Sequence, residues 1–118
     1  MKVLLTGANG QLGLCFQDCI SDSIELTALS SKELDITSKA SVQKMVDSLK
    51  PDVIVNCAAY TAVDKAESEP ELAHAVNCQG PENLAYAAAI LDIPLIHVST
   101  DYVFDGNATE PYIPTDAT

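Results

Sequence analysis

The sequence predicts an α/β fold in which a mainly parallel sheet is covered by helices on both faces. Short apolar runs, typical of buried parallel strands, alternate with longer segments whose apolar residues recur at helical spacing. The first apolar run leads at once into a glycine-rich segment, residues 6–13, that opens such a helical pattern. These features predict a doubly wound, three-layer α/β/α sheet of the Rossmann type that stops after its fifth strand.

Each strand is predicted from an apolar run that ends at a glycine, a proline or a polar cluster. The five expected strands are residues 2–6, 24–29, 34–36, 53–57 and 95–99. Because helical segments separate most of them, we expect parallel pairing with right-handed crossovers. The expected strand order is 3-2-1-4-5.

The helices are predicted from apolar spacing and from capping residues. We expect a helix over residues 11–20 and a second that is capped by Thr37 or Ser38 and ends before Pro51. A third helical segment should open at Ser68 with an S-x-x-E capping box and run to Leu91. Gly80-Pro81 lies inside it, which predicts either a kink or two abutting helices.

The charge balance limits the classes of partner. The 118 residues carry 17 acids and six basic residues, all lysine, for a net charge of −11. We therefore expect no nucleic-acid partner and no membrane partner. Without arginine, a bound phosphate must be held mainly by backbone N–H groups and a helix N-terminus.

The four cysteines do not form a metal-binding pattern. Cys15 and Cys19 share a helix face, but Cys57 and Cys78 and the two histidines lie far away in sequence. We interpret all four as buried free thiols of a cytoplasmic protein, and we expect no metal.

The glycines of residues 6–13 are spaced G-x-x-G-x-x-G. Gly7 permits a sharp turn off the strand, Gly10 lets the backbone approach a pyrophosphate, and Gly13 lets the helix pack closely on the sheet. The N–H groups of residues 9–12 would then point at the anion. The alternative is a tight strand–helix turn with no ligand. The structural context favours a dinucleotide site, because the motif follows a buried strand and opens a helix.

The residues at the end of the second strand leave the choice between NAD and NADP open. An acid there would hold the ribose 2′-hydroxyl of NAD, but Ser30, Ser31 and Lys32 come first and no acid appears until Glu33. This order slightly favours NADP, whereas a solvated Lys32 would carry no such preference. Residues 35–36 are better placed beside the adenine.

Five segments together carry a specific resemblance. They are T-G-A-N-G-Q-L-G at 6–13, L-D-I-T at 34–37, N-C-A-A-Y-T-A-V-D-K-A-E at 56–67, V-N at 76–77 and S-T-D-Y-V-F-D-G at 99–106. In this order they closely resemble the dTDP-4-dehydrorhamnose reductase family of the extended short-chain dehydrogenase/reductase superfamily. The resemblance covers essentially the whole chain.

The resemblance implies that NADPH or NADH delivers hydride to the C4 ketone of dTDP-4-dehydro-rhamnose, a nucleotide-sugar used for bacterial surface polysaccharide. It implies that Thr100 hydrogen-bonds the keto oxygen as a catalytic residue and that Asp101 contacts substrate. The residues that match cofactor-binding positions, with those of the glycine loop, are Gly7, Asn9, Gly10, Gln11, Leu12, Gly13, Ser30, Asp35, Ile36, Ala58, Ala59, Tyr60, Thr61 and Val98.

Plainer interpretations of several of these residues stay open. Thr100 would in that case only hydrogen-bond the backbone at a strand end. Tyr60 and Tyr102 would be core aromatics that shape the pocket. Asn77 would be an ordinary helix-surface residue, although asparagine is unfavourable inside a helix without a partner. We interpret His97 as a core or partly covered histidine and not as a base.

The Tyr-x-x-x-Lys pair that supplies the proton in such enzymes is absent from the sequence, because no tyrosine has lysine four places on. We expect residues 1–104 to form the dinucleotide-binding domain and residues 105–118 to be a loop leading to that pair and to a substrate domain. The fragment should then be inactive alone. A homodimer is a further expectation, because the last strand would leave an unpaired sheet edge.

Two other functions remain alternatives. One is a dinucleotide-binding regulatory relative without catalysis, and the other is a sister nucleotide-sugar epimerase or dehydratase.

Overall fold

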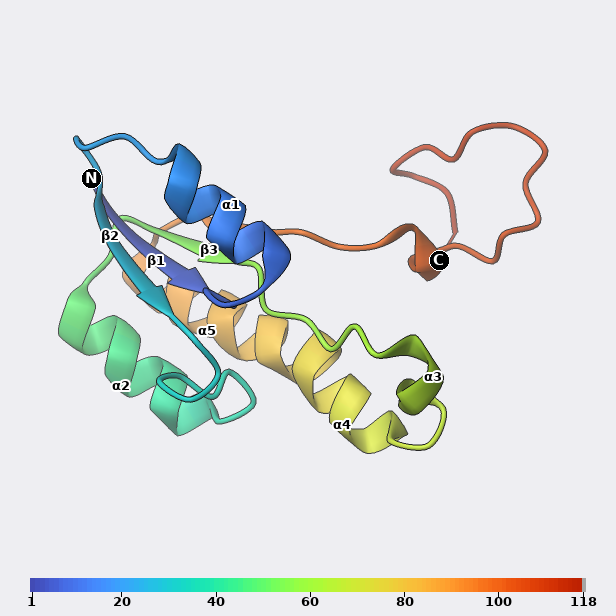
Figure 1. Ribbon diagram of the computed structural model, residues 1–118, viewed down its shortest axis with the longest axis horizontal. Coiled ribbons are helices and arrows are strands. Elements are labelled where there is room, and N and C mark those ends of the chain that lie inside the picture. Colours follow the sequence, from blue (N-terminus) through green and yellow to red (C-terminus); the bar gives the residue numbers. More distant parts are fainter. Residues whose placement is uncertain (118) are drawn as a thin grey trace.

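Four parallel strands form the central sheet of the computed structural model, which describes residues 1–117 (Figure 1). They run in the order β2-β1-β3-β4. Their bounds are β1 Lys2–Thr6, β2 Glu25–Leu29, β3 Val53–Asn56 and β4 Leu95–His97. The strands end together at one edge of the sheet, where the glycine-rich segment also lies (Figure 1).

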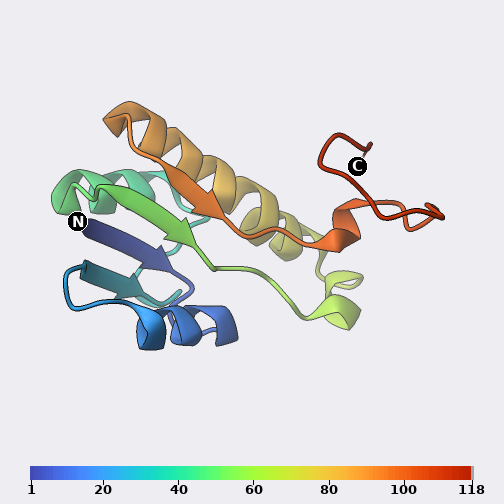
Figure 2. The same cartoon turned by 90° about the horizontal axis from the view of Figure 1, so that it is seen from above.

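Helices cover both faces of this sheet, so the predicted three-layer α/β/α architecture is confirmed (Figure 2). One face carries α1 (Gln11–Cys19), and the other carries α2 (Lys39–Leu49) and α5 (Gly80–Leu91). The remaining helical pieces are α3 Val63–Ala66, α4 Pro70–His74, the π-helical turn η1 Ala75–Gln79 and the 3₁₀ turn η2 Asp101–Val103. No helix within residues 1–117 is long and apolar enough to cross a membrane.

The core is divided in two by the sheet, because alternate side chains of a strand point to opposite faces. Leu4 and Ile54 pack with α2 and α5 in the larger cluster. Leu5 and Val55 form a smaller cluster under α1, where Phe16 of the helix is only partly buried. The face under α2 and α5 therefore supplies most of the apolar packing.

The expected third strand over residues 34–36 is wrong, and the sheet therefore has four strands and not five. The backbone in this region is used for local turns, in which the N–H groups of Glu33 and Leu34 donate to the Ser30 carbonyl. The Asp35 carboxylate accepts from the N–H and the hydroxyl of Thr37 at 2.9 and 2.7 Å. Such Asx turns compete with strand pairing. The other four strands have the predicted order.

Of the two arrangements expected around Gly80-Pro81, the structure has the abutting helices: α4 and α5 follow one another through the π-helical turn η1. A π-helical turn precedes Gly80 and Pro81, and the Gly80 N–H donates to the Ala75 carbonyl. The extra residue in this turn accommodates Pro81, which has no N–H and would clash with a carbonyl in a regular α-helix.

The expected capping box at Ser68 is also wrong. The N-cap is Glu69, and the Ser68 hydroxyl donates to the Lys65 carbonyl at 2.9 Å. The short helix α3 supplies that competing acceptor. The Ser38 cap of α2 is confirmed, since its hydroxyl accepts from the Ser41 N–H at 3.3 Å.

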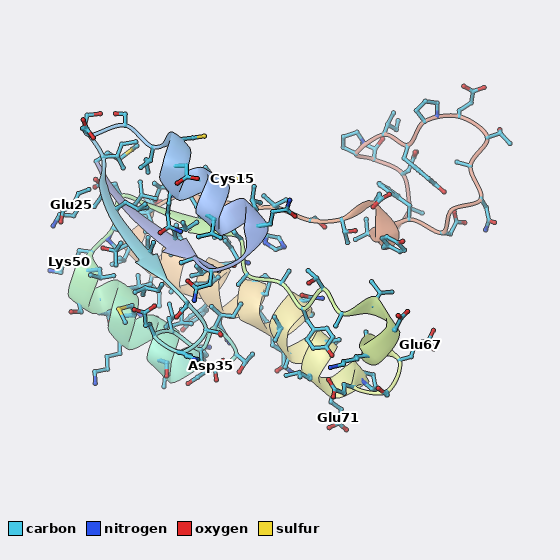
Figure 3. The ribbon with its side chains drawn as sticks, in the orientation of Figure 1. Cys15, Glu25, Asp35, Lys50, Glu67 and Glu71 are labelled. Atoms are coloured by element: carbon cyan, nitrogen blue, oxygen red, sulfur yellow. The ribbon has the colours of Figure 1, made fainter. Side chains whose placement is uncertain are left out.

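The cysteines are not buried as expected. Cys15, Cys19 and Cys78 are exposed and Cys57 is partly buried, and all four are free thiols. For Cys15 and Cys19 the cause lies in α1, whose only buried residue is Gly13 because no second helix among the described residues lies beside it on that face. Figure 3 shows Cys15 on the outer side of this helix.

Residues 98–117 extend away from the sheet and fold back on themselves (Figures 1 and 2). The rings of Phe104 and Tyr112 stack with their centroids 4.3 Å apart. The Asp105 carboxylate accepts from the Asn107 N–H at 3.0 Å and from the Tyr112 hydroxyl at 3.0 Å. The Asn107 N–H, followed by the Tyr112 hydroxyl, lowers the pKa of Asp105.

Candidate functional site

A cavity of about 210 Å³ lies at the edge of the sheet where the parallel strands end. It opens between the segments that follow β1, β2 and β3, which is where the chain crosses from one side of β1 to the other. Ligands of open α/β sheets bind at such a switch point. The lining residues are Gly7, Asn9, Gly10, Ser30, Ser31, Leu34, Asp35, Ile36, Cys57, Ala58, Ala59 and Val76.

The glycine loop is held tightly against the end of β3. Gly7 has a φ of +74°, and a Cβ atom there would lie 2.5 Å from the Ala58 nitrogen. A Cβ on Gly13 would lie 2.2 Å from the Gly7 carbonyl oxygen. Both positions therefore require glycine. The positive φ of Gly7 fits the sharp turn that the sequence predicts, and at both positions the close approach of backbone to backbone leaves no room for a Cβ atom.

The beginning of α1 presents N–H groups with no partner inside the helix. The first intrahelical bond runs from the Leu14 N–H to the Gly10 carbonyl at 2.9 Å, so the N–H groups of residues 11–13 precede the helical ladder. Gly10 caps the helix with no side-chain hydrogen bond. Among the described residues, no acidic side chain lies in the first turn of α1, and an anion is the natural partner of such an end.

Gln17 braces this loop from within α1. Its side-chain nitrogen donates to the Ala8 carbonyl at 2.8 Å and to the Gly13 carbonyl at 3.0 Å. The sequence did not point to Gln17, because its spacing from the glycines shows no motif.

The turn after β2 forms a second wall and contains an unpredicted contact. Glu33 Oε2 accepts from the Ser30 N–H at 2.8 Å and from the Ser30 hydroxyl at 2.7 Å. The Ser30 N–H, and then its hydroxyl, lower the pKa of the Glu33 carboxyl. Glu33 comes three residues after Ser30 in the sequence. The turn nevertheless brings its carboxylate to the end of β2.

The next part of this wall is fixed by α5. Asn83 donates from its side chain to the carbonyls of Ile36 and Thr37, at 2.9 and 3.2 Å. Ile36 packs against Gly80, where a Cβ would lie 2.5 Å from the Ile36 Cδ1 atom. The start of α5 therefore holds the backbone of Ile36 and Thr37, next to Asp35 in the cavity wall.

The loop after β3 forms the third wall. Asn77 of the π-helical turn donates to the Tyr60 carbonyl at 3.0 Å and accepts from the Tyr60 N–H at 2.8 Å. Asn77 lies on the helix surface, as its plain interpretation expects, but both ends of its amide hold the loop.

Asn56 ties the ends of three strands together. Its Oδ1 atom accepts from the Thr6 hydroxyl at 2.5 Å and from the Ala58 N–H at 3.1 Å. Its amide nitrogen, which can only donate, lies 3.0 Å from His97 Nδ1, so that nitrogen of His97 is the acceptor. Asn56 is fully buried, but His97 is exposed and is not the covered histidine that we expected.

Cys57 lines the cavity next to Ala58. Desolvation raises the pKa of its thiol. A raised pKa keeps the thiol protonated and makes it a poor nucleophile at neutral pH.

Several predicted site residues lie outside this cavity. Thr100 is exposed at the start of η2, where its hydroxyl accepts from the Tyr102 N–H at 3.3 Å and donates to Asp101 at 3.3 Å. Tyr102 is 81% exposed and is not a core aromatic. The other predicted residues outside the cavity lining are Gln11, Leu12, Gly13, Tyr60, Thr61 and Val98.

Tyr60 is hydrogen-bonded through its hydroxyl to Glu69 Oε2 at 2.6 Å. This bond, followed by desolvation and the charge of Glu69, raises the pKa of Tyr60. A tyrosine that donates a proton in catalysis needs its pKa lowered. The surroundings of Tyr60 therefore do not suit that role.

The cavity has several features that a dinucleotide site requires. Backbone approaches backbone closely at Gly7 and Gly13, the N–H groups of residues 11–13 precede the helical ladder, and Asp35 and Ile36 line one wall. The cavity alone is smaller than the ~300–1,000 Å³ typical of a complete ligand site. The described residues thus form one part of a larger site.

The comparisons with known proteins agree with this arrangement. The family model described as RmlD substrate binding domain matches residues 1–118. The chain is 46% identical over 118 residues to a dTDP-4-dehydrorhamnose reductase of Sinorhizobium fredii, covering 100% of this chain and 40% of the relative. The chain thus spans about two fifths of the length of the curated relatives it matches.

Solved structures give the same result. A dTDP-4-dehydrorhamnose reductase from Clostridium acetobutylicum superposes with a TM-score of 0.94 at 46% identity, over 98% of this chain and 42% of that one. A reductase from Bacillus anthracis in complex with NADP gives 0.87 at 42% identity, over 91% and 39%. With a family model that matches along its whole length, the chain belongs to the RmlD substrate-binding domain family.

Proposed function

We propose that this chain is the part of a nucleotide-sugar reductase that binds NADPH or NADH. The observation that carries the proposal is the cavity at the switch point of the sheet, which Asn9 and Gly10 line. The N–H groups that follow them, at the start of α1, have no partner inside the helix. No arginine is available in the sequence, so the pyrophosphate would be held by these backbone groups. Support also comes from the relative that is solved in complex with NADP.

The other walls would hold the adenosine half. Ser30 lies at the end of β2, which is the position that contacts the ribose in such sheets. Asp35 and Ile36 would flank the adenine, and Ala58 and Ala59 would lie along the ribose and nicotinamide side. Gln11, Leu12, Gly13, Tyr60, Thr61 and Val98 complete the proposed cofactor contacts.

The proposed reaction is reduction of the C4 ketone of dTDP-4-dehydro-rhamnose, for which the bound cofactor supplies the hydride. Named relatives at 46% identity support this substrate. Within this chain, Thr100 would hydrogen-bond the keto oxygen and Asp101 would contact substrate. To do so, the Thr100 hydroxyl must give up its hydrogen bond to the Asp101 carboxylate and donate to the substrate oxygen.

Binding tests the first part of the proposal. We expect NADPH and NADH to bind the 118-residue chain, measured by isothermal titration calorimetry or by the fluorescence of the reduced nicotinamide. Binding should be weak, because the described cavity encloses only part of a dinucleotide. Gly10→Trp, which would fill the approach to the helix amides, should abolish it without unfolding the chain. If Gly10→Trp binds the dinucleotides as tightly as the wild type does, the proposed phosphate-binding position is wrong.

Catalysis tests the second part. We expect no turnover when the chain is incubated with NADPH and the keto-sugar nucleotide, because no tyrosine in the sequence has lysine four places on. The hydrogen bond from Tyr60 to Glu69 raises the pKa of that tyrosine, which does not suit a proton donor. Oxidation of NADPH above the rate without protein would show that the chain holds a proton donor that this account misses.

A further inference from the structure

A β-turn joins β1 to α1 and forms the tip of the glycine loop. The Gly10 N–H donates to the Gly7 carbonyl at 3.0 Å and closes this turn, so Ala8 and Asn9 are its two central residues. The peptide between the central residues of a β-turn has two common orientations, those of type I and type II, which differ by a flip of that peptide. Type II requires a positive φ at the third residue of the turn, which is Asn9 here.

Asn9 is compatible with both orientations of this peptide. Asparagine is, after glycine, the residue that best tolerates the positive φ of a type II turn. Asn9 does not adopt it, because Lys50 and Asp92 are the only described residues other than glycine with a positive φ. The turn therefore has the type I orientation, although its sequence does not forbid type II.

Gln17 of α1 holds the central peptide in the observed orientation. Its side-chain nitrogen donates to the Ala8 carbonyl at 2.8 Å and also to the Gly13 carbonyl at 3.0 Å. The Ala8 N–H donates to the Leu29 carbonyl at 3.1 Å, so both backbone groups of this residue have partners. A flip of the Ala8–Asn9 peptide would break the bond to Gln17.

The orientation of this peptide decides what the turn presents to an anion. In a planar trans peptide the C=O and N–H groups point in opposite directions, so a carbonyl that faces Gln17 directs the Asn9 N–H away from it. Within residues 1–117 this N–H has no hydrogen-bond partner, and Asn9 lines the cavity. The flipped peptide would present the Ala8 carbonyl oxygen in its place, and the partial negative charge of that oxygen repels a phosphate.

We propose that Gln17 is a positioning residue for dinucleotide binding, which holds the Ala8–Asn9 peptide so that its N–H, and not its carbonyl, faces the pyrophosphate. This inference rests on the proposed function, because it concerns the same phosphate-binding loop. Gln17 does not line the cavity and acts through the backbone alone. A glutamate of the same shape would have an ionised carboxylate, which only accepts, and would leave the Ala8 carbonyl without this donor.

The test compares ADP, which carries a diphosphate, with adenosine, which carries none. Gln17→Met keeps the length of the side chain and removes its donors. We expect the dissociation constant for ADP to rise roughly fivefold, the factor for one typical hydrogen bond. Gln17→Glu should weaken ADP at least as much, and adenosine should give the same titration curve with all three chains. Shifts of the amide ¹H–¹⁵N signals measure both ligands, and urea unfolding shows that the variants are folded.

Substitutions of Asn9 separate control of the peptide orientation from general support of the loop. Asn9→Gly makes the flipped turn easier to form, and Asn9→Ala makes it harder. The effect of Gln17→Met on the ADP constant should therefore exceed fivefold when combined with Asn9→Gly and fall below about twofold when combined with Asn9→Ala. An effect of the same size in all three backgrounds would show that Gln17 does not control the flip, and would overturn the inference.

Gln43→Met is the matched control. It makes the same change at a half-buried glutamine of another helix, one that donates to Asp47 at 2.9 Å and does not line the cavity. Its affinity for ADP should equal that of the wild type. An unchanged ADP affinity in both Gln17 variants, or an equal loss for adenosine, would overturn this inference alone. A folded wild-type chain that binds neither NADPH nor ADP would overturn the proposed function and the inference together.

Discussion

Tyr60 and Asn77 meet where the loop after β3 passes the π-helical turn. Asn77 holds the backbone of Tyr60 with two hydrogen bonds, and Glu69 holds the Tyr60 hydroxyl. The ring is therefore fixed at its backbone and at its tip, both times by the segment that begins at α4. At the scale of single residues, the wall of the cavity is built by polar side chains that bind backbone.

The bond between Tyr60 and Glu69 can be tested by titration. Glu69→Gln removes the charged acceptor that contributes most to the raised pKa of Tyr60, so this pKa should fall towards its usual value. The measurement is the ultraviolet absorbance of tyrosinate against pH, compared between variant and wild type. Glu71→Gln, two residues on, should leave the curve unchanged. A curve for Glu69→Gln that overlays the wild type would contradict the contact.

The bond between Asn77 and Tyr60 should matter more for binding than for stability. Asn77→Ala removes two hydrogen bonds at an exposed position, and we expect a loss of about 1 kcal/mol in the free energy of unfolding. Because the loop wall loosens, the affinity for NADPH should fall by several-fold. Denaturant unfolding and calorimetry measure the two effects. Gln79→Ala is the control on the same turn and should bind NADPH as the wild type does. If Asn77→Ala binds NADPH as tightly as Gln79→Ala, the loop after β3 does not form a wall of the binding site.

At the scale of elements, the contact between the glycine loop and β3 positions the cavity. Gly7 and Gly106 share a φ of +74°, but only Gly7 has backbone within reach of a Cβ atom, and nothing lies within 4 Å at Gly106. The pair therefore separates the cost of a left-handed residue from the cost of close packing.

Substitution of these glycines by alanine should give unequal results. Gly106→Ala should cost about 1–2 kcal/mol, the cost of the left-handed conformation. Gly7→Ala adds a clash with the Ala58 and Cys57 backbone, and we expect it to cost about 3 kcal/mol or more in the free energy of unfolding. Thermal or urea unfolding measures both. Similar losses at the two positions would contradict the close approach.

The sequence predicted those elements whose patterns are local and strong. The glycine loop and the Ser38 cap follow from spacing within one element, and the order of the four strands follows from the alternation of strands and helices along the chain. Residues 34–36 were assigned wrongly because an Asx turn at Asp35 competes with strand pairing. Cys15 was expected to be buried because an apolar face was assumed to be covered, which depends on neighbours that sequence spacing does not show.

The site residues that the sequence missed depend on contacts between distant segments. Asn83 reaches the Ile36 carbonyl across 47 positions of the chain. The one available signal was chemical: asparagine at positions 77 and 83 and glycine at position 80 are unfavourable inside a helix, and each has a partner in a cavity wall. Unfavourable residues in a strong helical pattern thus indicated the contacts, although not their partners.

At the scale of the whole molecule, the sheet has an open edge at β4 and a thinly covered face under α1. Within residues 1–117, β4 pairs with β3 alone, and Ile96 of β4 is 55% exposed. Leu14 of α1, on the thinly covered face, is 52% exposed. Open strand edges with apolar side chains promote association between chains.

Self-association through this edge is the prediction at that scale. We expect the sedimentation coefficient of the chain to rise with concentration, and Ile96→Lys to suppress the rise, because a charge on an edge strand opposes pairing. Ile90→Lys replaces a residue of α5 that is 53% exposed and serves as the control. Association that persists in Ile96→Lys would place the contact elsewhere.

The claim on which the account depends is that backbone N–H groups at the start of α1 receive the pyrophosphate of a dinucleotide. The most direct measurement is an amide ¹H–¹⁵N spectrum of the labelled chain during titration with NADPH. We predict that the largest shifts fall on residues 9–12, with smaller ones at Ser30 and Ala58. Saturable binding that leaves the signals of residues 9–12 in place would contradict the account.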